Sequence, residues 1–513
     1  MNIRKTFSLT KIIATLGPAT SDPETLTSLI ENGARVFRVN FSHGTFEQYR
    51  EMIRNVRETS KMLGIYTSLL GDLSGPKIRV GEIPGNGIFL KPGMMVRFCD
   101  EENSHTSLGA EAVICFTTSY PPFTREVKPG QRVLLDDGNL LLQCESNSDT
   151  DVICRVVNGG LVTTHKGINL PDTELSIPAL TQKDYHCIDF AVEQGFDFLA
   201  LSFVRQGEDV RLLKQRLTEL KARPGVSWPG PSTNPVIPPT AKDFEGFIPV
   251  ISKIEKPQAI DHLISILEES DGIMVARGDL GVEMDLAEVA VHQKNIIRLC
   301  RQYGKPVIVA TQMLQTMIES PVPTRAEVSD VANAIFDGAD AVMLSGETAV
   351  GKYPVETVKM MNRIARKAND YIRSLDSHPL IPFKPLEEHN RSAAIAHGVI
   401  TMVRDVDARL IIVWSQYGGA TLFLSQHKLP VPILSFSNNE RTLRQHSLLY
   451  GVHAVFMDMP SSGSRFIENV DRLILKNVWA HKGEPIVIAL GEPIHRVGIT
   501  NRVVVHYVGE SEL

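Results

Sequence analysis

The feature that most constrains the fold of this chain is a repeated alternation of short apolar runs with longer segments of helical periodicity. The apolar runs lie at residues 11–15, 35–41, 65–70, 198–203, 250–255, 272–276, 306–310 and 341–344. Strands that alternate with helices in this way are typical of a parallel sheet. Eight such units predict an α/β protein built on a closed (β/α)8 TIM barrel. An open, doubly wound sheet is the alternative, although no G-x-G-x-x-G motif follows the first run.

The alternation is interrupted once, directly after Gly75-Pro76. From there to about residue 164 only short β-type runs occur, and the pattern K-P-G-x-x-V appears at 91–96 and again at 128–133. Each copy predicts a Pro-Gly turn that leads into a strand. We therefore expect a small β-rich barrel or sandwich, the lid domain, inserted into the barrel.

A further α/β unit begins at about residue 391, with apolar runs at 410–413, 433–436, 453–456, 485–489 and 503–507. The predicted domains are a catalytic barrel (1–76 and 166–372), the lid domain (77–165) and a C-terminal α/β domain (373–513). Residues 224–243, rich in Pro, Gly, Ser and Thr, are expected to form an insertion on the non-catalytic face of the barrel.

Composition excludes several classes of function. A net charge of −6 over 513 residues gives no reason to expect nucleic acid or a membrane as a partner. No run approaches the ~18 apolar residues of a membrane-spanning helix, and the apolar run near the N-terminus is too short for a signal peptide. The six cysteines include no C-x-x-C pair, so we expect buried free thiols rather than disulfides or a zinc site. Free thiols favour a cytoplasmic location.

Charged and polar residues follow nearly every predicted barrel strand. They are Arg38, Asn40, Ser42, His43, Asp72, Lys253, Glu255, Arg277, Asp279, Thr311, Gln312, Ser345 and Glu347. Lys253 and Glu255 are two positions apart, so on a strand they share one face. An ion pair at a solvated strand end is one interpretation of this pair. Active sites of such barrels lie at the C-terminal ends of the strands, so a catalytic face is the other.

The residue types at these strand ends predict the chemistry. Glu255 and Asp279 are oxygen donors suited to Mg²⁺, although they could instead pair with neighbouring cations. Arg38, Lys253 and Arg277 could neutralise an anionic substrate. The turn that begins at Gly278 offers backbone N–H groups to a carboxylate or phosphate. Metal, cations and backbone donors without an evident nucleophile indicate phosphoryl transfer.

The chain resembles the pyruvate kinase family over essentially its whole length. The matching segments are KIIATLGP (11–18), RVNFSHG (38–44), GDLSGPKIR (71–79), DDG (136–138), KGINLP (166–171), ISKIE (251–255), MVARGDLG (274–281), TQML (311–314) and MLSGETA (343–349). The resemblance implies transfer of a phosphoryl group from phosphoenolpyruvate to ADP, giving pyruvate and ATP in glycolysis. It also implies Mg²⁺ (or Mn²⁺) as cofactor, a homotetramer, and a possible phosphorylated effector.

The resemblance also implies residue roles. Glu255 and Asp279 match the Mg²⁺ ligands, and Lys253 matches the cation on the transferring phosphoryl group. Arg38 would bind the phosphate of phosphoenolpyruvate, and Gly278, Asp279 and Thr311 its carboxylate, with Thr311 also assisting protonation of the enolate. The nucleotide phosphates would meet Arg79, Lys166, Asn40 and His43. The monovalent-cation site corresponds to Asn40, Ser42, Asp72 and Leu73.

Three segments depart from the family pattern, one of which is the insertion at 224–243. Members that need K⁺ resemble Asp-Thr-Lys-Gly-Pro-Glu where this chain has Asp72-Leu73-Ser74-Gly75-Pro76-Lys77. The ammonium of Lys77 could supply the charge of K⁺, so we expect K⁺ not to be required; a solvent-facing Lys77 is the alternative. The second segment is the effector loop, whose candidate residues are Ser415, Gln416, Gly418, Gly419 and Thr421. The family's Arg-rich continuation is missing there, and an ordinary glycine turn is the alternative.

Two other functions remain open from the sequence. One is a Mg²⁺-dependent aldolase or lyase that acts on 2-oxo acids, although such an enzyme has no use for a β-rich lid. The other is a catalytically inactive relative that serves as a binding protein. Inactive relatives usually lose a metal ligand or the reacting cation, whereas Lys253, Glu255, Asp279 and Arg38 are all present here.

Overall fold

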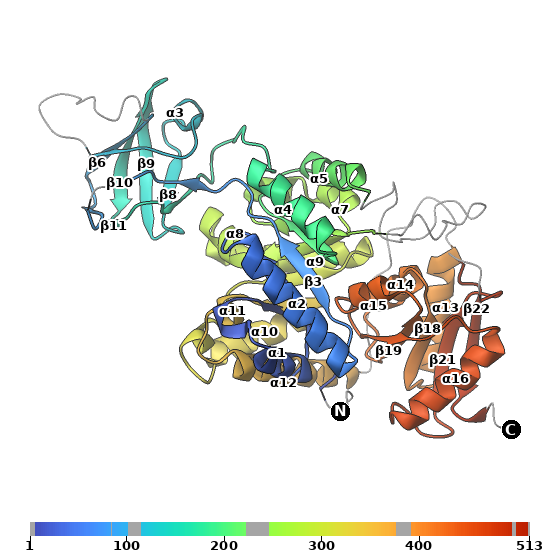
Figure 1. Ribbon diagram of the computed structural model, residues 1–513. Helices are drawn as coiled ribbons and strands as arrows, with labels where there is room; N and C mark the ends of the chain where they lie inside the picture. Colours follow the sequence, from blue (N-terminus) through green and yellow to red (C-terminus); the bar gives the residue numbers. More distant parts are fainter. Residues whose placement is uncertain are drawn as a thin grey trace, which may run out of the picture.

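The structure, a computed structural model, describes residues 6–83, 85–100, 114–221, 246–375, 391–494 and 499–510. Within these ranges it comprises a central barrel, a β-rich lid and a C-terminal α/β domain (Figure 1). The predicted insertion at 224–243 lies outside the described residues. No helix in the described part of the chain is both long enough and apolar enough to cross a membrane.

Parallel strands close into a barrel in the order β1-β17-β16-β15-β14-β13-β3-β2, which confirms the predicted fold class. The strands are β1 (Lys11–Thr15), β2 (Ala34–Asn40), β3 (Ser68–Asp72), β13 (Phe198–Leu201), β14 (Val250–Ile254), β15 (Gly272–Ala276), β16 (Val307–Ala310) and β17 (Ala341–Leu344). The surrounding helices are α1 (Pro23–Glu31), α2 (Phe46–Leu63), α4 (Gln182–Glu193), α5 (Gly207–Glu219), α6 (Pro257–Asp261), α7 (Leu263–Glu269), α8 (Arg277–Glu283), α9 (Leu286–Gln302), α10 (Arg325–Asp337), α11 (Gly346–Ala349) and α12 (Pro354–Arg373).

Two barrel strands differ by more than one residue from their predicted bounds, each for a local reason. The third was expected from residue 65, but the N–H of Ile65 donates to the Ser60 carbonyl (3.1 Å) and completes the cap of α2, so β3 begins at Ser68. The fourth was expected to reach residue 203, but β13 ends at Leu201 because Phe203 adopts φ 56°. A residue in the left-handed region cannot continue a strand.

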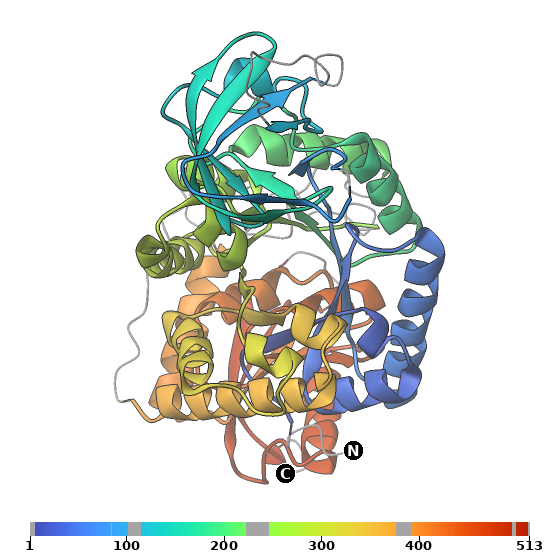
Figure 2. The same cartoon turned by 90° about the vertical axis from the view of Figure 1, so that its left-hand side faces the viewer.

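The lid contains a sheet in the order β4-β12-β8-β9-β10-β6-β7 and a two-stranded ribbon, β11-β5, within the described residues. Its elements are β4 (Ile78–Arg79), β5 (Ile88–Leu90), β6 (Met95–Cys99), β7 (Ile114–Phe116), α3 (Phe123–Glu126), β8 (Arg132–Leu135), β9 (Leu140–Asn147), β10 (Asp151–Asn158), β11 (Gly160–Val162) and β12 (Gly167–Asn169). The lid stands beyond one end of the barrel (Figure 2). The exact domain boundaries stay a prediction.

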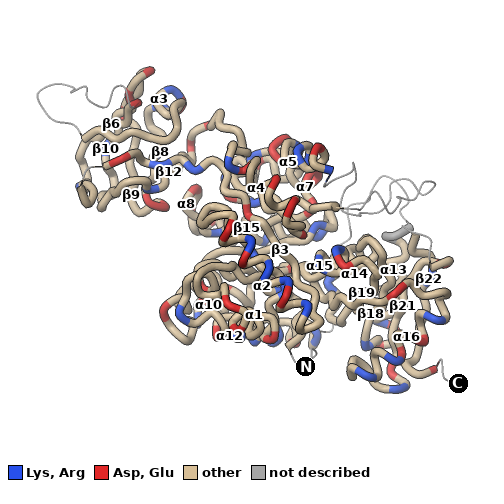
Figure 3. Tube along the Cα trace, in the orientation of Figure 1, with Lys and Arg blue, Asp and Glu red and all other residues tan. Residues whose placement is uncertain are grey.

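The C-terminal domain has a sheet in the order β20-β19-β18-β21-β22, in which only β22 is antiparallel among the described strands. Its elements are α13 (Arg391–Asp405), β18 (Leu410–Trp414), α14 (Gly419–Gln426), β19 (Ile433–Ser437), α15 (Glu440–His446), β20 (Val452–Phe456), α16 (Gly463–Lys476), β21 (Pro485–Leu490) and β22 (Arg502–Tyr507). Apolar residues of this domain continue directly into the interior of the barrel, so one core joins the two. Acidic and basic residues are interspersed over all three domains (Figure 3).

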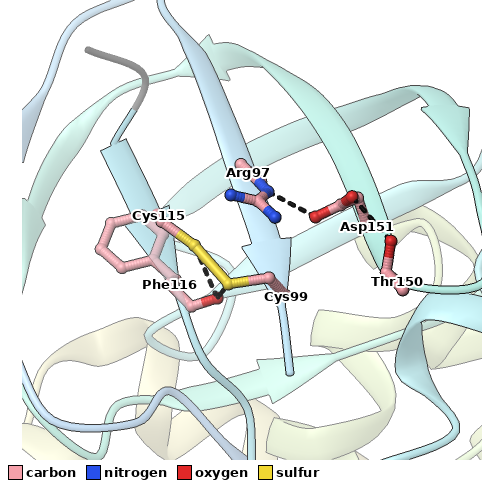
Figure 4. Close-up of a disulfide and its surroundings, with 6 residues drawn as sticks. All are labelled: Arg97, Cys99, Cys115, Phe116, Thr150 and Asp151. Carbon is pink, nitrogen blue, oxygen red and sulfur yellow. Dashed lines mark hydrogen bonds and ion pairs between the residues drawn. A yellow bond between two sulfur atoms is a disulfide. The ribbon is translucent and has the colours of Figure 1, made fainter. Parts of the chain in front are cut away.

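The expectation that all cysteines are free is wrong for one pair. Cys99 and Cys115 form a disulfide across the neighbouring strands β6 and β7, with their Cα atoms 6.8 Å apart (Figure 4). The two residues are 16 positions apart, a separation that carries no recognisable spacing signal, and only strand pairing brings them together. Cys144, Cys154, Cys187 and Cys300 are buried free thiols, as expected. The disulfide removes the argument from free thiols for a cytoplasmic location.

Candidate active site

Lys253 lies at the centre of the candidate site and is the penultimate residue of strand β14, at its C-terminal end. Its ammonium is 2.7 Å from Glu255 Oε1 and 3.3 Å from Asp72 Oδ1, and it donates to Ser202 Oγ at 2.8 Å. The side chains of Lys253 and Glu255 are only 11% and 2% exposed. The predicted pair therefore forms, but at a buried position rather than at a solvated strand end.

Asp72 links Lys253 to the other cation of this cluster. Arg38, near the end of β2, donates from Nε to Asp72 Oδ2 at 2.7 Å and from a terminal nitrogen to Thr15 Oγ1 at 3.2 Å. Burial acts to raise the pKa of Asp72, but Lys253 and Arg38 outweigh it, so the pKa lies below its usual value. Asp72 therefore remains an anion that holds both cations in place.

Glu255 and Asp279 come from adjacent strand ends, and the charge of Asp279 acts on Glu255. Glu255 Oε2 accepts the backbone N–H of Phe203 at 2.9 Å, which the left-handed turn after β13 directs toward it. Burial raises the pKa of Glu255, and the charge of Asp279, in the first turn of α8, raises it further against the influence of Lys253. A cation held between these two carboxylates would relieve that repulsion, so the residues fit a divalent metal ion.

The pKa of Lys253 shows that the cluster as a whole favours positive charge at this atom. Burial acts to lower the pKa, but the carboxylates of Asp72, Glu255 and Asp279 raise it above its usual value. Lys253 is therefore protonated at neutral pH and cannot act as a general base. A permanently charged ammonium suits stabilisation of an anionic group in transfer.

Gly278 and Thr311 lie side by side at the ends of β15 and β16. The N–H of Gly278 donates to Thr311 Oγ1 at 2.6 Å, and a Cβ at position 278 would lie 3.2 Å from that oxygen. Thr311 has φ 70°, which directs its side chain toward this turn. Arg277 pairs with Asp330 at 2.6 Å and donates to the carbonyl of Thr311 at 3.0 Å, so its guanidinium is engaged by neighbouring protein groups.

The predicted monovalent-cation site is assembled in part. Asn40 Oδ1 accepts the N–H of Ser42 at 3.1 Å, and the carbonyl of Leu73 accepts from Ser202 Oγ at 2.7 Å. Lys77 is exposed and makes no side-chain hydrogen bond or ion pair with any described residue. Its charge still reaches the neighbouring loop, since the pKa of His43 is lowered by burial and then by Lys77.

The predicted nucleotide contacts lie at the hinge between barrel and lid. Arg79, on β4, donates to the His165 carbonyl at 2.8 Å. Lys166, directly before β12, pairs with Asp136 at 2.5 Å. Neither contacts Arg38 or Lys253 within the described ranges, so the structure places these two cations in the hinge rather than in the buried cluster.

The candidate effector loop precedes α14, and Gly418, with φ 94°, forms its N-cap. The hydroxyl of Thr421 is buried and bonds Ser435 Oγ at 2.7 Å. The carbonyl of Gln416 accepts from Ser437 and Thr442, both at 3.1 Å. The loop is thus tied to residues of β19 and α15 by hydrogen bonds, and the Thr421 hydroxyl is already engaged.

Sequence reasoning missed three groups that shape the site. Ser202 and the N–H of Phe203 contact Lys253 and Glu255, although a serine after an apolar run is only a weak signal. Buried Glu283, at the end of α8, accepts from Asn169 of the lid hinge at 2.7 Å and pairs with Lys256. No sequence pattern indicated this connection between the hinge and α8.

Comparisons with known proteins agree with the fold and the strand-end residues. The family description "Pyruvate kinase, barrel domain" matches residues 7–223 and 240–358, and "Pyruvate kinase, alpha/beta domain" matches 393–506. A pyruvate kinase of Mycobacterium intracellulare is 38% identical over 98% of this chain and 99% of its own length. One from Thermotoga maritima is 37% identical over 96% of this chain and 98% of its own.

Solved structures give the same result. The crystal structure of a pyruvate kinase from Cryptosporidium parvum superposes with a TM-score of 0.85 at 32% identity, covering 98% of this chain and 96% of that one. The superposition covers both the barrel that carries Lys253 and the C-terminal domain. The chain is therefore a kinase and belongs to the pyruvate kinase family.

Proposed function

We propose that the protein transfers a phosphoryl group from phosphoenolpyruvate to ADP, yielding pyruvate and ATP in glycolysis. The observation that carries this proposal is the buried cluster in which the Lys253 ammonium lies 2.7 Å from Glu255 and 3.3 Å from Asp72, with Arg38 on the other oxygen of Asp72. Two preorganised cations, on β2 and β14 and joined through Asp72, suit an anion whose charge must be stabilised during transfer.

In the proposed reaction, a terminal phosphate oxygen of ADP attacks phosphorus as the bond to the enol oxygen breaks. Arg38 binds the phosphoryl group before transfer, and Lys253 stabilises its charge in flight. The Gly278 and Asp279 backbone, with Thr311, holds the substrate carboxylate, and Thr311 assists proton delivery to the methylene carbon through water. Arg79, Lys166, Asn40 and His43 bind the nucleotide once the lid (77–165) closes.

Glu255 and Asp279 would hold a Mg²⁺ (or Mn²⁺) ion, which supplies neutralisation of the phosphate charge when bound. The described residues contain no cluster of three or more His, Cys, Asp or Glu side chains that could hold a metal alone. Two carboxylates completed by substrate and water oxygens are the usual arrangement for Mg²⁺. Omitting the divalent ion should therefore abolish turnover.

The activity test is a coupled assay for ATP formed from ADP and phosphoenolpyruvate. We expect robust, Mg²⁺-dependent turnover. An enzyme that forms no ATP under these conditions, yet cleaves a 2-oxo acid, would instead support the aldolase or lyase alternative.

We further propose that turnover does not need K⁺. Support comes from Leu73 and Lys77 in the strand-three loop and from the charge of Lys77, which adds to burial in lowering the pKa of His43. Replacing K⁺ by tetramethylammonium should leave turnover unchanged, and a drop of tenfold or more would contradict the proposal.

The loop at 415–421 is proposed to bind a phosphorylated effector mainly through backbone N–H groups, because the Thr421 hydroxyl is engaged by Ser435. Sugar phosphates and nucleoside monophosphates should then shift the phosphoenolpyruvate saturation curve, whereas identical curves with every compound would count against the site.

We also propose that the protein is a homotetramer located in the cytoplasm. The molar mass from light scattering would test the tetramer, and subcellular fractionation would test the location.

A further inference from the structure

Glu283 connects the lid to the barrel at the place where the two domains meet. It is the last residue of α8, and its side chain is only 1% exposed. Its Oε1 accepts from Asn169 Nδ2 at 2.7 Å and also binds the ammonium of Lys256. Asn169 ends lid strand β12, which lies next to α8 in Figure 3, whereas Lys256 directly follows Glu255 in the barrel. One carboxylate oxygen is therefore shared between a lid residue and a barrel residue.

The barrel side of this connection reaches both candidate metal carboxylates. Asp279 lies on α8 four residues before Glu283, so the two side chains are neighbours on one side of the helix. Lys256 is next to Glu255 in the chain, and its ammonium lies 5.7 Å from the ring centre of Phe203, whose N–H binds Glu255. A displacement of Glu283 would therefore reach both carboxylates, one through the helix and the other through Lys256.

The lid side of the connection carries the two candidate nucleotide cations. Arg79, on β4, pairs in register with Gly167, which lies two residues before Asn169 on the neighbouring strand β12. Lys166 directly precedes β12 and pairs with Asp136 at 2.5 Å. Whatever holds Asn169 in place therefore also holds the strand on which the positions of both cations depend.

Two further features show that the lid approaches this end of α8. Gly138, in the turn after β8, has φ 83°, and a Cβ at this position would lie 3.4 Å from the side chain of Val282. The pKa of Arg132, on β8, is raised by its hydrogen bond to Asp172, against burial, and further by the charges of Asp172 and Glu283. The end of α8 therefore meets the lid at more than one point.

A purely structural ion pair is the other interpretation of Glu283. Its Oε2 atom is buried and has no hydrogen-bond partner among the described residues. A buried polar atom without a partner destabilises a fold, so this carboxylate is not arranged for the greatest stability. The arrangement instead places the other oxygen where a lid donor and a barrel cation meet.

We propose that Glu283 is a positioning residue that couples the lid hinge to the metal carboxylates through its contacts with Asn169 and Lys256. The hydrogen bond from Asn169 sets where β12, and with it Arg79 and Lys166, lies relative to the barrel when ADP binds. This inference rests on the proposed function, in which those two cations bind the nucleotide phosphates. Phosphoryl transfer depends on alignment of the two substrates, so a displaced lid weakens ADP binding, whereas phosphoenolpyruvate is held by barrel residues.

The test combines two measurements on the full-length protein: steady-state kinetics with each substrate varied in turn, and calorimetric titration of Mg·ADP alone. Asn169→Asp keeps the size of the side chain but places a second carboxylate against Glu283. The double variant Asn169→Asp/Glu283→Gln restores a donor and an acceptor in the reverse direction and keeps one carboxylate near Lys256. Asn147→Asp is the matched control, because Asn147 donates only within the lid, to the Thr124 carbonyl at 3.3 Å.

We expect Asn169→Asp to raise the KM for ADP and the calorimetric Kd for Mg·ADP at least tenfold, because an acceptor replaces the donor that Glu283 needs. The KM for phosphoenolpyruvate should change less than twofold. The double variant should recover to within threefold of the wild type, and Asn147→Asp should match the wild type. A structural ion pair alone predicts lower stability in urea unfolding without this split between the two KM values.

The proposal is overturned if Asn169→Asp keeps the wild-type affinity for ADP, if both KM values rise together, or if the double variant does not recover. Failure of the proposed function gives a different result. A wild type that binds Mg·ADP but forms no ATP would refute phosphoryl transfer, and the calorimetric comparison of the variants would still decide the role of Glu283. A wild type that binds no Mg·ADP would overturn both.

Discussion

Replacing Lys253 by Met is the sharpest test of the proposed chemistry. The substitution keeps the length and apolar stem of the side chain and removes only the ammonium, which contacts Glu255 at 2.7 Å, Ser202 at 2.8 Å and Asp72 at 3.3 Å. Loss of one preorganised electrostatic contact to the reacting group lowers kcat by roughly 10²–10³, equivalent to about 3–4 kcal/mol. We expect a loss at least that large, because Lys253 carries a full charge.

The same change has a structural cost that must be separated from the chemical one. Removing one partner of a buried ion pair costs about 3–5 kcal/mol of folding free energy. Asp72 keeps Arg38, so the cost falls mainly on Glu255, which retains the N–H of Phe203. Protonation of Glu255, or a bound divalent ion, would reduce the penalty toward the lower end of that range.

Lys428→Met provides the matched control. Lys428 is also buried and pairs with a buried aspartate, Asp340, which directly precedes β17 at the opposite end of the barrel from the catalytic face. Both variants should lose stability in urea unfolding, but only Lys253→Met should lose kcat in the coupled assay.

The raised pKa of Lys253 also predicts the pH profile of the wild type. Loss of the Lys253 proton should cause no decrease of kcat between about pH 6 and 9.

Two results would refute the reasoning. A Lys253→Met enzyme with kcat within threefold of the wild type would show that the ammonium does not stabilise the transferring group. Equal losses of kcat in Lys253→Met and Lys428→Met would assign the effect to stability rather than chemistry.

Three further predictions concern other parts of the molecule. Asp197→Asn should cost about 3–5 kcal/mol in urea unfolding because Arg57 and Arg444 lose a shared buried partner. Arg57 and Arg444 hold the pKa of Asp197 below its usual value, although burial acts to raise it. The stabilisation that charged Asp197 gives the fold is therefore complete above the pKa of the unfolded state and is lost as pH falls through the lower pKa of the folded state. The free energy of unfolding of the variant should therefore fall less steeply in acid. Glu255→Gln should raise the Mg²⁺ concentration for half-maximal rate at least tenfold; an unchanged Mg²⁺ titration would exclude Glu255 as a ligand. Lys77→Glu should create a requirement for K⁺, measured by turnover with and without the ion, and K⁺-independent turnover of the variant would contradict the role of Lys77.

Much of the site was predictable because active residues of a parallel barrel follow its strands. The run at 250–255 shows the principle: an apolar strand ends in Lys253 and Glu255, and alternation places both on one side. Asp279 could be assigned to the same end of the barrel from its position after the next strand. These inferences use only local periodicity and the common direction of parallel strands.

Contacts across distant segments required the tertiary structure. Whether Lys253 faced solvent or a buried acid depended on Asp72, which is 181 positions away in the chain and reaches it only through barrel closure. Cys99 and Cys115 likewise meet because β6 and β7 pair, a choice of neighbours that neither strand's composition specifies. Lys77 illustrates the same limit, since its sequence suggests a cation site but its exposed position is set by the hinge.

The sequence by itself therefore determined the alternation of strands and helices, the lid inserted after the third strand, and the strand ends at which charged residues gather. Those features follow from periodicities of about two and 3.6 residues, which each segment carries within itself. Only the tertiary structure decided which charges are partners, which cysteines join, and where the C-terminal domain meets the barrel. Such contacts depend on packing between segments that are not adjacent in the chain, and the free energy of each pair is set by burial and neighbours rather than by local sequence.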